Sequence, residues 1–142
     1  MPTVTGDFEV RRDAQPMLDL GDGAQAAHVR FDKMFRGPLE ATSVVHMLAV
    51  GTATEGSAAY VAVERIVGTL DGRAGSFLMH HTGVMDRGAP SLAVNVVPDS
   101  GAGALAGLRG TLAIEIVDGR HRYTFDYALP DAHADADAPP AS

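Results

Sequence analysis

The stretch YVAVERIVGTLDGRAGSFLMHHTG, residues 60–83, decides the fold of this chain. Asp71-Gly72 lies at its centre, and Asp-Gly between two alternating segments is the strongest short-range signal for a two-residue hairpin turn. That turn pairs Glu64 with Met79 and makes Glu64 and His81 diagonal neighbours on one surface. The whole surface consists of Tyr60, Ala62, Glu64, Ile66, Phe77, Met79 and His81.

The opposite surface of the same hairpin is also rich in apolar residues. Val61, Val63, Val67 and Leu78 form a band on it. A large exposed apolar band usually marks an interaction surface, and partner chains are the simplest cover. The sequence therefore predicts a homo-oligomer, either a dimer or a trimer.

A second hairpin is predicted over residues 112–127, LAIEIVDGRHRYTFDY, with Asp118-Gly119 as its turn. Its outward surface carries Glu115 directly opposite Arg122, an exposed pair worth at most about 1 kcal/mol. The inward surface is apolar and aromatic. Its members are Leu112, Ile114, Ile116, His121, Tyr123, Phe125 and Tyr127.

The remaining chain also alternates with period two between Gly, Pro and Asp residues, and no long helical repeat is present. The fold class is therefore all-β, a single antiparallel barrel of about eight strands, because closure removes the exposed sheet edges. The domain is expected over residues 1–129, followed by a disordered acidic tail over residues 130–142. The expected strands are Thr3–Val10, Ala27–Phe35, Ala41–Val50, Ser57–Leu70, Arg73–Gly83, Ser91–Val97, Leu108–Val117 and Arg120–Leu129.

Composition excludes several classes of function. The 142 residues include no cysteine, which rules out disulfides, thiolate nucleophiles and cysteine-ligated metals. A net charge of -7, with Lys33 as the single lysine, argues against nucleic acid as a partner. No apolar run is long enough for a membrane helix, so we expect no membrane partner and a cytoplasmic location.

Glu64 and His81 are the candidate catalytic residues. A carboxylate and an imidazole within reach of each other can act as general acid and base. The alternative is that Glu64 is satisfied by its neighbours and only locks the barrel, because buried charges are usually paired. The candidate ligand-binding residues surround this pair on the inward surfaces of the two hairpins. They are Tyr60, Phe77, Met79, His121, Tyr123 and Tyr127.

Neither a metal site nor a cofactor site is expected. His80 and His81 are consecutive and so face opposite sides of a strand, and no His-x-His pair exists. The glycine-rich segment 98–110 lacks the spacing of a dinucleotide-binding or phosphate-binding loop. It is expected to be a tight connection with a helical turn at Ala104 to Leu108.

Five segments form an ordered series of motifs: YVAVER (60–65), GTLDGRAGSF (68–77), HTG (81–83), VPDSGAG (97–103) and GRHRYTFDY (119–127). Together they resemble the bacterial family known as domain of unknown function 3224, over most of residues 5–129. The resemblance implies a barrel similar to that of allene oxide cyclase, a fold class that includes cyclases and other small-molecule proteins. The family brings no settled activity, and Ala102 and His80 depart from its pattern, where threonine and glutamine are expected.

An eight-stranded barrel has an interior wide enough for packed side chains or for one small ligand. The leading hypothesis is therefore a small-molecule-binding barrel, with an isomerase or cyclase acting on an apolar ligand as the candidate enzyme. The alternative is a non-catalytic carrier, or a structural or stress-associated barrel with a filled interior.

Overall fold

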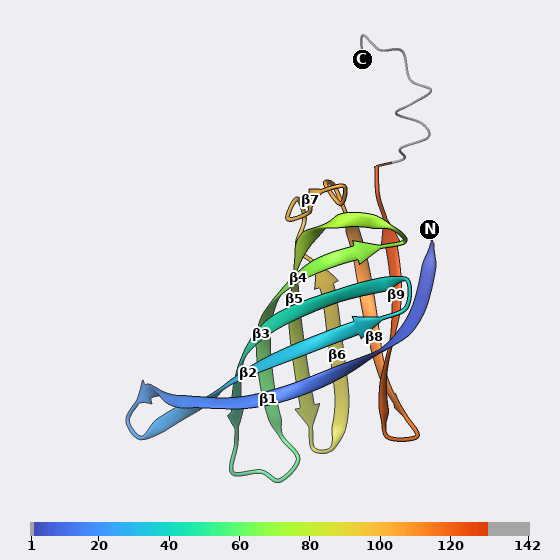
Figure 1. Ribbon diagram of the computed structural model, residues 1–142. Coiled ribbons are helices and arrows are strands. Elements are labelled where there is room, and N and C mark those ends of the chain that lie inside the picture. The colour runs from blue at the N-terminus through green and yellow to red at the C-terminus, as the bar shows by residue number, and fades with distance from the viewer. Residues whose placement is uncertain (1, 131–142) are drawn as a thin grey trace.

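The computed structural model describes residues 2–130, which form a closed antiparallel barrel of eight strands with one short extra strand (Figure 1). The wall runs from β1 to β6 and on to β8 and β9, and β9 pairs with β1 to close it. The all-β barrel predicted from the sequence is confirmed, and residues 2–130 contain no helix. The strands are β1 (Thr3–Gly21), β2 (Ala24–Arg36), β3 (Leu39–Gly51), β4 (Ala58–Leu70), β5 (Arg73–Asp86), β6 (Ala89–Val96), β7 (Ala102–Gly103), β8 (Arg109–Val117) and β9 (Arg120–Ala128).

Both hairpin registers predicted from Asp-Gly pairs are confirmed. Glu64 pairs with Met79 across β4 and β5, and Leu112 pairs with Phe125 across β8 and β9. Asp71 has a φ of 49° and Gly72 a φ of 81°, as a type I′ turn requires. None of the described residues belongs to a helix that could span a membrane. The predicted tail lies, except for Pro130, outside the described residues.

The first strand is much longer than predicted. We expected Thr3–Val10, whereas β1 continues to Gly21. A third Asp-Gly pair, Asp22-Gly23, forms the β1–β2 turn with φ values of 51° and 81°. Pro16 argues against a regular strand, and it lies where the register shifts between Gln15 and Leu18. The bulge therefore accommodates the proline, which has no N–H to donate.

One end of the barrel is closed by the connection between β6 and β8. Its β7 strand pairs with β5, and Leu105 and Leu108 are buried beneath it. Where a helical turn is expected at Ala104 to Leu108, residues 104–107 form successive turns that are not continued as a helix, with Leu108 N donating to Leu105 O at 3.1 Å. This closed end lies at the top of Figure 1.

The other end of the barrel, at the bottom of Figure 1, carries the β1–β2, β3–β4, β5–β6 and β8–β9 turns. Alternation places Leu92 and Ile116 on the same inward faces as the buried Val94 and Leu112, yet they are 47% and 69% exposed. Asn95 and Thr111 form the single register pair between β6 and β8 in the described residues. We call this region the open end.

The apolar band on the outer face of β4 is present. Val61 and Val63 are more than half exposed, and Val67 is also exposed. The single chain leaves the band open to solvent, and the dimer or trimer stays a prediction. Light scattering at micromolar concentration would test it, since a mass of 14.8 kDa would contradict it.

Candidate functional site

Glu64 lies in the middle of β4 with its side chain inside the barrel. Alternation buries it together with Ala62 and Ile66. Its register partners are Val45 on β3 and Met79 on β5. The side chain has no exposed surface, so no water-sized space adjoins it. An ionised carboxylate in such a place is tolerated only when other groups pair with it.

Three side chains donate hydrogen bonds to this carboxylate. Lys33 Nζ lies 3.2 Å and His81 Nε2 lies 2.7 Å from Oε1. Ser43 Oγ donates to Oε2 at 2.6 Å. Both oxygens of Glu64 are therefore satisfied, and two groups that can carry positive charge share one of them. We call these four residues the Glu64 cluster.

The strand registers bring the cluster together. Lys33 on β2 is directly opposite Ser43 on β3, and His81 is opposite Ala62, one inward position from Glu64. Lys33 is also 5.0 Å from the ring centroid of Phe8, close enough for a cation–π contact. Four strands thus contribute one polar side chain each to an otherwise apolar interior.

These contacts decide the ionisation of Glu64. Burial by itself raises the pKa of the carboxyl. The hydrogen bond from His81, the charge of Lys33 and the hydrogen bond from Ser43 act in the opposite direction and outweigh it, so the pKa of Glu64 lies below its ordinary value. Glu64 is therefore a carboxylate at neutral pH, and a fully hydrogen-bonded one.

The side chains of His81 and Lys33 keep a small exposed surface of 6% and 8%, and Ser43 is 5% exposed. The side chain of Glu64 is sealed. His81 donates a hydrogen bond from Nε2 to Glu64, and no side chain among residues 2–130 bonds to its other ring nitrogen, Nδ1. Glu64 thus fixes the orientation of the imidazole and leaves one ring nitrogen for another partner.

The sequence matches the profile of the family described as protein of unknown function (DUF3224) over residues 4–127. The chain belongs to this family. A crystal structure of a DUF3224 protein of unknown function from Shewanella oneidensis is similar to it, with 44% identity and a TM-score of 0.85. The match covers 92% of this chain and 98% of that one. No curated protein matches the sequence.

Two of the predicted ligand-binding residues of this DUF3224 chain lie away from Glu64. Tyr60 is half-buried at the open end, where its ring covers Gly83 so closely that a Cβ there would be 2.1 Å from Tyr60 Cε1. His121 packs against the ring of Phe8, with 5.2 Å between ring centroids. Both face inward, as predicted, but on different sides of the barrel.

The other four predicted residues are buried in the core. Met79 lies next to Glu64 and is fully buried, and Phe77 stacks on Phe125 at 6.0 Å. Tyr123 and Tyr127 use their hydroxyls within the protein. The Tyr127 hydroxyl donates to Asp71, and burial together with that carboxylate raises the pKa of Tyr127 to about 12.

Sequence reasoning missed Lys33 and Ser43. The signal was available, because Val29, Lys33 and Phe35 share one phase of the alternation in β2, while Arg30 and Asp32 occupy the other. A charged residue in the inward phase of a strand predicts a buried partner.

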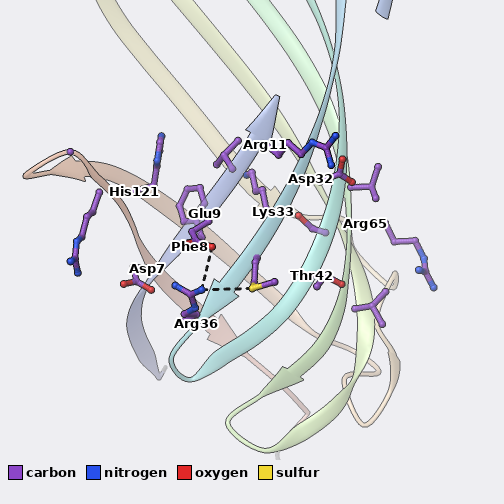
Figure 2. A pocket seen from close by; sticks show the side chains of 17 residues that line it. Asp7, Phe8, Glu9, Arg11, Asp32, Lys33, Arg36, Thr42, Arg65 and His121 are labelled. Atoms are coloured by element: carbon purple, nitrogen blue, oxygen red, sulfur yellow. Dashed lines mark hydrogen bonds and ion pairs between the residues drawn. The ribbon is translucent and has the colours of Figure 1, made fainter. Parts of the chain in front are cut away.

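A large surface hollow reaches the cluster, because Lys33 and Ser43 belong to its lining together with the inward-facing Phe8 and His121. It lies over β1 to β4 and the β8–β9 turn, and Figure 2 shows its lining, which also includes Arg11, Asp32 and Arg65. Alternation places these side chains outside the barrel wall. In the same hollow Arg36 Nη2 binds Glu9 Oε2 at 3.2 Å, a pair in which both side chains are mostly exposed. Such pairs contribute little to stability, so the outer part of the hollow is a solvated charged face.

Proposed function

We propose that the barrel binds an apolar small molecule at its open end and holds the polar group of that molecule against His81 and Lys33. The observation that carries this proposal is the exposure of inward-facing apolar side chains at one end only. Leu92 and Ile116 belong to the inward phase of their strands and still face water. A ligand seated there would remove apolar surface from water, at about 25 cal/mol for each Å².

The position of the Glu64 cluster supports the polar half of the proposal. His81 is opposite Ala62, which lies about 7 Å nearer the open end along β4 than Glu64. A ligand entering from that end would therefore meet His81 before Glu64. Phe31, Met47 and Tyr60 are inward-facing, half-buried residues along the same route.

An isomerase or cyclase reaction in this site would divide the work between two residues. His81 would transfer the proton through Nδ1, and Glu64 would be a positioning residue that holds the imidazole by Nε2. Glu64 is itself a poor base, because it is sealed and its oxygens already accept three hydrogen bonds. The cytoplasmic location and the comparison with allene oxide cyclase stay predictions.

The second candidate is a structural barrel, and the sealed state of Glu64 favours it. A buried carboxylate whose two oxygens are both hydrogen-bonded can serve only to fix the packing of the four strands. In that case the open end would be a surface without a ligand. A non-catalytic carrier would share the ligand site of the first candidate and lack the reaction.

The experiment compares two adjacent positions on β8. Ile116→Glu places a charge on the inward face, and Val117→Glu places the same charge on the outward face. The probe is 8-anilinonaphthalene-1-sulfonate, which combines an apolar body with one anionic group, and its fluorescence reports binding. We expect Ile116→Glu to weaken binding at least tenfold, about 1.4 kcal/mol, and Val117→Glu to leave it nearly unchanged.

His81→Gln tests the polar contact, with its melting temperature as the control for stability. It should weaken probe binding while the protein remains folded. Equal effects of the two glutamate variants, or no binding to the wild type, would reject the ligand site and favour the structural barrel.

A further inference from the structure

Two histidines outside the barrel form a pair that the Glu64 cluster does not involve. His28 on β2 and His46 on β3 belong to the outward phase of their strands and are diagonal neighbours. His28 Nε2 lies 2.9 Å from His46 Nδ1, and the ring centroids are 5.1 Å apart. Both side chains are at least partly exposed.

The pair lines a surface hollow whose other walls are mainly apolar. Leu48, Val61 and Val63 line it, and His80 and His81 on β5 belong to the same lining, although Nε2 of His81 is bonded to Glu64. Arg30 is opposite His46 in the register, and it binds Asp32 at 3.0 Å, which offsets its charge. No acidic side chain lines the hollow, so the imidazoles are its main metal-binding groups.

We propose that His28 and His46 bind one divalent transition-metal ion through these two facing nitrogens. With metal–nitrogen bonds of about 2.0–2.1 Å, donors 2.9 Å apart subtend about 90° at the ion. That is the angle between adjacent ligands in square-planar and octahedral coordination. A tetrahedral zinc site would need the two nitrogens about 3.4 Å apart. The present spacing therefore fits Cu²⁺ or Ni²⁺ better than Zn²⁺.

Binding requires a small rearrangement of the two rings. The proton that now lies between the two nitrogens is displaced, and the ring that carried it is protonated on its other nitrogen instead. Each ring also turns about χ2, a torsion with a broad energy minimum, so that both lone pairs meet at the ion. Within residues 2–130 no three His, Asp or Glu side chains could hold one ion together, so water completes the coordination.

The test is calorimetric titration of the untagged full chain with Cu²⁺, Ni²⁺ and Zn²⁺. We expect one ion per chain, tighter binding of Cu²⁺ and Ni²⁺ than of Zn²⁺, and a visible absorption band typical of imidazole-bound Cu²⁺. His28→Gln and His46→Gln should each lower the affinity at least tenfold, because each removes one of two protein ligands. Circular dichroism confirms that the variants are folded.

Three further variants are matched controls. His80→Gln changes another imidazole of the same hollow, and His121→Gln changes one inside the barrel. His133→Gln changes the histidine beyond the described residues. All three should bind as the wild type does. A loss of affinity in any of them equal to that of His28→Gln, or no effect of His28→Gln and His46→Gln, would overturn the proposal.

Discussion

The two ends of the barrel are built from the same alternating strands, yet one is filled and the other is open. At the closed end Phe77 stacks on Phe125, and Leu105 and Leu108 cover them. At the open end Ile116, in the same phase as buried residues, is 69% exposed. The difference comes from the connections: the β6–β8 connection, residues 97–108, folds over one end, whereas the other end has three two-residue turns and one longer loop.

The inward-facing tyrosines of the two ends differ in their hydrogen bonds. At the closed end the Tyr123 hydroxyl accepts a hydrogen bond from Leu39 N at 3.0 Å and donates to Arg36 O at 2.9 Å. At the open end the Tyr60 hydroxyl makes no hydrogen bond with any other described residue. The polar contacts of the open end lie instead between its turns, where Arg87 N donates to Ser57 Oγ at 3.1 Å.

The largest expected effect compares one core residue from each end. Phe125→Ala should lower the free energy of unfolding by about 3–5 kcal/mol, because it removes a fully buried ring and leaves a cavity. Ile116→Ala should change it by less than about 0.5 kcal/mol, because the side chain is already in water. Urea unfolding measures both. Comparable losses would mean that the open end is also packed in solution.

The second prediction concerns the cluster that lies between the two ends. Lys33→Met should lower the free energy of unfolding by about 3 kcal/mol. This is the lower limit for breaking a buried ion pair, and we expect it because His81 and Ser43 still bind Glu64 in the variant. Lys33→Arg is the control that retains the charge. If urea unfolding finds Lys33→Met neutral, the ion pair contributes no net stability and the structural candidate loses its main support.

The sequence predicted the barrel because Asp-Gly turns fix registers, and a register fixes which residues share a face. Glu64 and His81 could be paired in this way from Asp71-Gly72 alone. Lys33 and Ser43 could not, because β2 and β3 are joined through Gly37-Pro38, which carries no Asp-Gly signal, and their register was therefore open. The alternation of the strand could not predict that Ile116 is exposed, because its exposure depends on where the 97–108 connection lies.

The third prediction compares one tyrosine from each end. Tyr123→Phe should lower the free energy of unfolding by about 1–2 kcal/mol, because it leaves the buried Leu39 N without its acceptor. Tyr60→Phe should be nearly neutral, since its hydroxyl has no partner to lose among residues 2–130. Thermal unfolding of the two variants measures the difference. A Tyr60→Phe variant as unstable as Tyr123→Phe would show that the open end is held by contacts of its own.

The smallest expected effect is the acid dependence of stability that Glu64 contributes. Burial raises the pKa of Glu64, and the three hydrogen-bond donors lower it. The net lowering of the pKa is therefore only the difference between these two effects. Because the folded pKa lies below the unfolded value of about 4.3, this contribution is fully present above pH of about 4.3. It is lost as the pH falls through the folded pKa, because the unfolded chain takes up the proton first. Glu64→Gln should flatten the pH profile of urea unfolding in this range, while Glu115→Gln, on the outer face, should keep the wild-type slope. If the slope of the unfolding free energy against pH is unchanged in Glu64→Gln, another carboxylate carries the acid dependence. The cluster would then not distinguish the charged form of the Glu64 carboxyl from the neutral form.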